Sequence, residues 1–156
     1  MGALMELVAG DSEAILIVIS TDDLAALAEP GRFVAHVSLG AGLDPTWLDL
    51  FSEAVRSVLG SAEPSDFLDA RRELEGPGES GGRTVERVDA RWIETIAQLR
   101  ERDIAAVAGR WLDLLEDELG ELPREEKPWI RELAGEIVRF CRAAERAPDV
   151  IFAWSL

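Results

Sequence analysis

The chain has 156 residues, of which 47% are hydrophobic and 30% are charged, a balance typical of one folded domain. It carries 31 acidic and 16 basic residues and therefore a formal net charge of −15. This charge repels nucleic acid and anionic lipid, so we expect neither a nucleic-acid partner nor a membrane partner.

Two short apolar runs, residues 4–8 and 14–19, open the chain, and the turn-forming pair Gly10 and Asp11 separates them. The second run is β-branched and apolar throughout, which is typical of a strand covered on both faces. The pattern predicts two strands.

The rest of the front half is interpreted from helix start signals and from apolar periodicity. We predict a short helix capped by Ser20 or Thr21 and ending at Pro30, a strand at residues 33–39, a helix starting at Asp44 and Pro45, and a short helix within residues 64–75.

The back half is mostly helical by its apolar spacing. We predict a strand at residues 84–88, helices starting at Asp89, Asp103 and Pro128, and a last strand at residues 150–154. The glycine-rich residues 76–82 predict a flexible loop inside a single domain of residues 1–156. The predicted fold class is α+β, with helices packed on a small, mostly antiparallel sheet and a helix-rich C-terminal half.

One resemblance to a known family lies in the back half. It consists of the spaced residues Val88-Asp89, Ile93, Leu99, Asp103-Ile104, Ala108 and Trp111, the helix end Cys141-Arg142-Ala143-Ala144, and the strand from Val150 to Trp154. Together with the Met1-Gly2 start, this pattern resembles the YfbM-like family of small bacterial proteins of unknown function. The resemblance implies no catalytic residues.

Candidate catalytic residues are few because the chain has one histidine, His36, and one cysteine, Cys141. Ser38 shares the strand face of His36 but lies about 7 Å away by strand rise, too far for a direct hydrogen bond. Cys141 falls on the apolar face of its helix, which favours a buried thiol. We therefore lean towards a protein that is not an enzyme, with no catalytic residues.

The same scarcity argues against metals. The chain has only one histidine and one cysteine, so it lacks the ligands that zinc prefers. The sequence also lacks the acidic residue spacing of an EF-hand calcium-binding loop. We expect neither a metal site nor a cofactor.

A strand-to-helix turn suggests an alternative function. Gly40 and Gly42 occupy the position of a phosphate-binding loop, although Asp44 places a negative charge where a phosphate would sit. These glycines, with His36 and Ser38, are the predicted ligand-binding residues of a small-molecule or cation-binding module of an uncharacterised bacterial family.

Negative charge is concentrated in the front of the sequence. Residues 1–55 contain nine acids and one base, Arg32, whereas the other residues contain 22 acids and 15 bases. A surface of one sign steers basic partners towards it. The predicted partner-binding residues are Asp22, Asp23, Glu29 and the aromatic Trp129.

The function predicted from these features is non-enzymatic binding of a basic protein, as an immunity protein or antitoxin neutralises its target. No apolar run is long enough for a signal peptide or a membrane span, so we expect a cytoplasmic protein.

Overall fold

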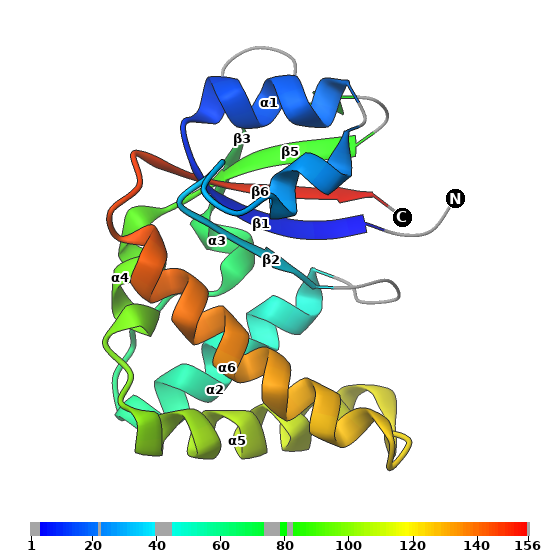
Figure 1. Cartoon of the computed structure of the whole chain (residues 1–156). Coiled ribbons are helices and arrows are strands. Elements are labelled where there is room, and N and C mark those ends of the chain that lie inside the picture. The colour runs from blue at the N-terminus through cyan, green and yellow to red at the C-terminus, as the bar shows by residue number, and fades with distance from the viewer. Residues whose placement is uncertain (1–3, 22, 40–44, 74–78, 81–82, 156) are drawn as a thin grey trace.

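The computed structural model describes residues 4–21, 23–39, 45–73, 79–80 and 83–155. Its elements are, in chain order, β1 (Leu4–Gly10), α1 (Ser12–Ser20), the 3-10 helix η1 (Leu24–Ala28), β2 (Ala35–Ser38), α2 (Thr46–Leu59), α3 (Phe67–Ala70), β3 (Arg71–Glu73), β4 (Glu79–Ser80), β5 (Arg83–Val88), α4 (Ala90–Ala97), α5 (Glu101–Leu119), α6 (Glu126–Ala144) and β6 (Asp149–Ser155). The predicted α+β class and the helix-rich C-terminal half are confirmed (Figure 1).

The strands form one antiparallel sheet in the order β2-β1-β6-β5-β3, with β4 also paired to β5. The last strand of the sequence, β6, lies between β1 and β5. Apolar side chains of β1 and β6 point alternately to the two faces of the sheet, so both faces bury hydrophobic surface.

Two layers of unequal size cover these faces (Figure 1). Helices α2 to α6 pack on one face, where the larger cluster includes Leu7, Phe51, Trp111 and Phe152. The smaller layer, α1 and η1, covers Val8, Ile151 and neighbouring residues on the other face. This arrangement places β2 at one edge of the sheet, beside α6.

The strand predicted at residues 14–19 is wrong, because this run lies in α1. Ile15, Val18 and Ile19 are buried, whereas Ile17 is 62% exposed, which is the periodicity of a helix packed on one side. An apolar run of this length is compatible with either a buried strand or a buried helix, and its packing against the sheet favours the helix.

Several predicted boundaries also differ from the structure. Neither Ser20 nor Thr21 caps a following helix, since η1 starts at Leu24 after Asp23. The helix expected within residues 64–75 is limited to α3, after which the chain continues as β3.

Two helix starts in the back half lie earlier than expected. The helix α5 begins at Glu101, and the Asp103 carboxylate accepts a hydrogen bond from the Arg100 amide at 3.1 Å. Pro128 lies inside the first turn of α6, where a missing N–H costs no helical hydrogen bond. The predicted cap at Asp89 is confirmed, because its carboxylate accepts from the Arg91 amide.

The predicted loop at residues 76–82 contains the short strand β4, which pairs with β5. The other residues of this segment lie outside the described residues. The single domain of residues 1–156 remains a prediction.

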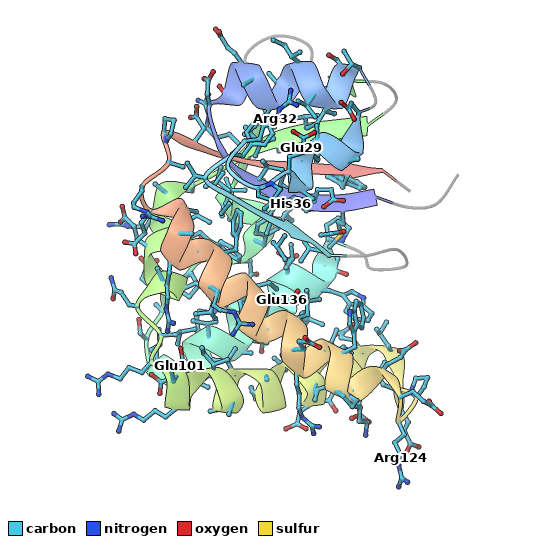
Figure 2. All side chains as sticks on the ribbon, viewed as in Figure 1. Glu29, Arg32, His36, Glu101, Arg124 and Glu136 are labelled. Atoms are coloured by element: carbon cyan, nitrogen blue, oxygen red, sulfur yellow. The ribbon has the colours of Figure 1, made fainter. Side chains whose placement is uncertain are left out.

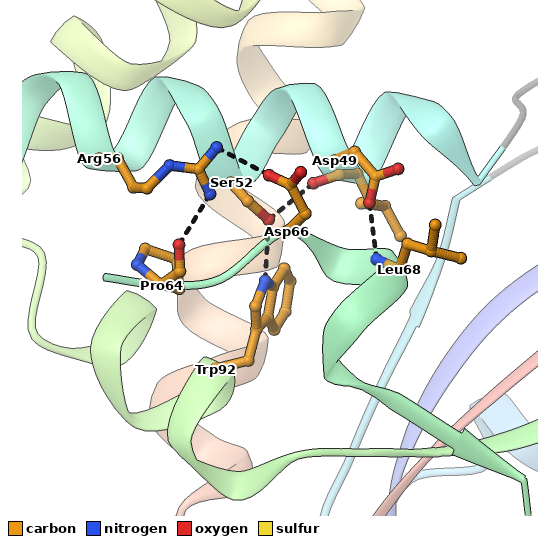
Figure 3. A network of polar contacts seen from close by, with 8 residues as sticks. Asp49, Ser52, Arg56, Pro64, Asp66, Leu68 and Trp92 are labelled. Atoms are coloured by element: carbon orange, nitrogen blue, oxygen red, sulfur yellow. Dashed lines mark hydrogen bonds and ion pairs between the residues drawn. The ribbon is translucent and has the colours of Figure 1, made fainter. Parts of the chain in front are cut away.

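A polar network fixes the position of α3 beside α2 (Figure 3). The buried Ser52 hydroxyl accepts from the Trp92 indole at 2.9 Å and donates to the Leu48 carbonyl. Arg56 donates to the Pro64 carbonyl and to Asp66, at 2.8 and 2.7 Å. The Arg56 contacts hold Pro64 and Asp66 against α2, and the Leu68 amide donates to Asp49 of α2 at 2.7 Å.

Candidate functional site

The α1–η1 surface, which we define as the described residues between Asp11 and Arg32, is mainly acidic. Its exposed acidic side chains are Asp11, Glu13, Asp23 and Glu29. Arg32 reaches Glu29 at 3.4 Å, with both side chains about half exposed, so the ion pair contributes little and the surface stays negative. The predicted residues Asp23 and Glu29 both belong to this surface, and Asp22 lies outside the described residues.

An apolar side chain lies within the same surface. Ile17 is 62% exposed on α1, one helical turn after Glu13. A large apolar group among acids gives a protein partner both a hydrophobic contact and a charge to match.

The second candidate region is centred on Glu6 in β1. Glu6 faces Ser38 across the β1–β2 ladder, and His36 lies two residues away on the same face. The His36 Nε2 atom lies 2.7 Å from one carboxylate oxygen of Glu6, and the Ser38 hydroxyl donates to the other oxygen at 3.2 Å. Glu6 is only 9% exposed, so these two contacts compensate for much of its lost hydration.

This geometry does not form a catalytic triad. In a triad the serine donates to the histidine, which acts as its base. Here both Ser38 and His36 bind the carboxylate of Glu6 instead of each other. His36 is a partly buried histidine of the sheet whose ring contacts a local carboxylate. The glycines expected to complete a ligand site, Gly40 and Gly42, lie outside the described residues.

Two clefts lie on either side of the edge strand β2. A cleft of about 570 Å³ runs between β2 and α6, where Glu136, Arg139 and Phe140 contribute to its lining. A smaller cleft of about 260 Å³ lies between β2 and the segment after η1, where Glu29 and Phe33 contribute. His36 lines both clefts. Figure 2 shows His36 on β2 and Glu136 on the neighbouring stretch of α6.

A further cleft of about 360 Å³ lies where β5 ends and β6 begins. Its apolar lining includes Ile93 and Val150, and its charged lining comprises Asp89, Glu94, Glu145, Asp149 and Arg87. Arg87 lies 3.3 Å from Asp149, so the remaining charges of the cleft are acidic. Negative surface is therefore present at this end of the sheet as well.

Trp129 does not join the predicted acidic residues. It is 39% exposed in the first turn of α6, and Figure 1 shows this end of the helix far from α1 and η1. Cys141 is fully buried, as predicted, and burial raises the pKa of its thiol above the ordinary value. It is therefore an unreactive core residue.

Three residues of these regions were not predicted from the sequence, namely Glu6, Glu136 and Phe140. A carboxylate inside the apolar strand around Glu6 is a usable signal, because a buried charge needs a polar partner. Glu136 and Phe140 gain their place only from the packing of α6 beside β2, which no local pattern encodes.

Among the described residues, no group of three or more His, Cys, Asp or Glu side chains could hold a metal ion. In the same residues, no helix is both long and apolar enough to cross a membrane. Comparison of the chain with protein-family models, curated proteins and solved structures finds no match. The resemblance to the YfbM-like family therefore stays a prediction.

Proposed function

We propose that this chain is a cytoplasmic, non-enzymatic binding protein that recognises a basic protein, in the manner of an immunity protein or antitoxin. The observation that carries the proposal is the α1–η1 surface, which combines exposed acids with an exposed isoleucine, Ile17. The acidic cleft at the start of β6 and the net charge of −15 extend the same negative field.

The alternative function, a small-molecule or cation-binding module around His36 and Ser38, has less support. Both side chains contact the Glu6 carboxylate, and Glu6 is only 9% exposed, so little of this group is open to a ligand. No observation favours this alternative over protein binding.

Electrostatic steering provides the test. A binding partner should be captured from an extract of the source organism, purified, and its association rate measured at rising salt concentration. The proposal predicts a basic partner whose association slows about tenfold or more as salt screens the charges. The double variant Asp23→Lys, Glu29→Lys should slow association by a similar factor while leaving the thermal midpoint close to that of the wild type.

A matched control changes the same number of charges elsewhere. Asp113→Lys and Asp117→Lys alter two exposed acids of α5, on the opposite side of the molecule from α1. This control should slow association much less than the change on the α1–η1 surface. A neutral or acidic partner, or equal effects of the two double variants, would contradict the proposal.

A further inference from the structure

The outer edge of β2 offers unpaired main-chain groups. Within the part of the chain that the structure describes, β1 is the strand that pairs with β2, and β2 ends the sheet on this side. The Leu39 amide donates to the Met5 carbonyl at 2.8 Å. In an antiparallel pair, every second residue of a strand directs its N–H and C=O to the neighbouring strand, and the residues between them direct these groups outward. Because Leu39 bonds to β1, the main-chain groups of Ser38 and His36 point away from β1.

This edge carries none of the usual residues that protect a strand from pairing. Natural edge strands are protected by lysine, by proline or by an inserted bulge. The four residues of β2 are Ala35, His36, Val37 and Ser38, so neither lysine nor proline occurs among them. Ser38 is exposed and His36 is partly exposed, and an edge strand of this kind can accept another strand.

The surroundings of β2 provide space for the side chains of an added strand. Side chains along a strand alternate between the two faces of the sheet. On one face they would enter the 570 Å³ cleft, against the flank of α6 that carries Glu136 and Phe140. On the other face they would enter the 260 Å³ cleft beside Glu29. An extended chain therefore finds main-chain partners and a cleft on both faces.

We propose that the β2 edge binds an extended, basic segment of the partner protein, which adds to the sheet as a further strand. The basic character of the segment rests on the proposed function. Cationic side chains of the segment would lie near Glu136 on one face and near Glu29 on the other. Arg139 also lines the cleft between β2 and α6. This cleft can therefore accept an acidic or neutral side chain of the segment in addition to cationic side chains.

The charge of the chain decides between two occupants of the edge. A second copy of this chain would bring a further charge of −15 against the same surface, and the residues up to position 55 carry nine acids against one base. Like charges disfavour that pairing, whereas a basic segment is attracted.

The test uses a capped peptide of eight residues with the repeat Lys-Lys-Val-Val, which places lysines on both faces of an added strand, and the same peptide with glutamate in place of lysine as the control. Hydrogen exchange of the His36 and Ser38 amides is measured with and without peptide. The lysine peptide should slow exchange at these two amides, and the glutamate peptide should not. Unchanged exchange rates of the two amides at about 1 mM lysine peptide would overturn the proposal, because a specific complex has a Kd of about 1 mM or lower.

Substitution of Ser38 separates main-chain from side-chain effects. Ser38→Pro removes the outward N–H, at a position where an edge strand tolerates proline, and Ser38→Ala removes only the hydroxyl. Ser38→Pro should weaken binding of the lysine peptide about tenfold or more, and Ser38→Ala should bind as the wild type does. Equal affinity of the two variants would overturn the proposal. If Ser38→Pro fails to fold, the exchange measurement on the wild type still decides.

The remaining outcomes separate this inference from the proposed function. If the captured basic partner binds Ser38→Pro as well as the wild type, the edge is not used, although the proposed function stands. If both peptides slow exchange equally, the addition of a strand at β2 is supported, and the prediction that the added segment is basic is wrong. A dimer of the chain that Ser38→Pro abolishes would assign the edge to a second copy and overturn the basic occupant.

Discussion

The Asp49 carboxylate lowers the stability of the folded state at neutral pH. Burial raises the pKa of Asp49, and nearby Asp66 adds to the rise, whereas the hydrogen bond from the Leu68 amide opposes it. The folded state therefore binds a proton more readily than the unfolded chain does. This contribution makes the protein more stable as the pH falls through the raised pKa, and the advantage is lost as the pH rises through it.

We predict that Asp49→Asn stabilises the protein at neutral pH. The amide oxygen can still accept the Leu68 N–H, and the cost of burying a charge disappears. The difference in the free energy of unfolding between variant and wild type should shrink as the pH falls, measured by urea denaturation at several pH values. Glu53→Gln, which removes an equal charge from an exposed position of the same helix, controls for net charge. A variant less stable than the wild type at neutral pH would contradict this account.

The Glu6, His36 and Ser38 contacts mark the limit of prediction for single residues. Strand alternation places His36 and Ser38 on one face, and the structure confirms this. The partner Glu6 is 30 residues from His36 in sequence. Its position follows from the register of β1 against β2, which local sequence patterns do not define.

At the scale of elements, two glycines are predicted to respond to alanine with opposite signs. In α5, a methyl group added at Gly109 meets no atom of the described residues within 4 Å. Gly109→Ala should stabilise by about 0.5–1 kcal/mol, because alanine loses less backbone entropy in a helix. At the end of α2, Gly60 has φ of 66°, and Gly60→Ala should destabilise by about 1 kcal/mol. Thermal unfolding of both variants checks the pair, and a shift of the same sign in both would refute it.

Helices with clear start signals and one-sided apolar stripes were predictable, as α2 and α4 show. The helix α1 was not, since its β-branched run also suits a buried strand. Its conformation is decided by the sheet face formed by β1, β5 and β6, which come from distant parts of the chain. The acidic surface was predictable in part, because charge is visible in the sequence. The cleft beside β2 was not, because it requires the position of α6.

At the scale of the whole molecule, the two clusters of the core share one sheet. Strands β1, β5 and β6 supply side chains to both faces, so neither layer has a sheet of its own. We therefore predict a single cooperative transition in urea. Tryptophan fluorescence reports the larger layer, which holds the buried Trp92 and Trp111, and far-UV circular dichroism reports all elements. The two curves should coincide. Separate midpoints would show that the α1–η1 layer unfolds independently, and would contradict the single domain.

The pairing of β1 with β6 has a consequence for synthesis on the ribosome. Leu4 lies opposite Ser155, so the centre of the sheet joins residues from opposite ends of the folded segment. Because the chain emerges from its N-terminus, β1 must wait for nearly all the other elements before its central neighbour exists. During that time β1 and β5 each lack the strand that separates them in the finished sheet. The nascent protein thus exposes one unpaired edge on each of these two strands until translation reaches β6, which makes this interval the period of greatest need for a chaperone.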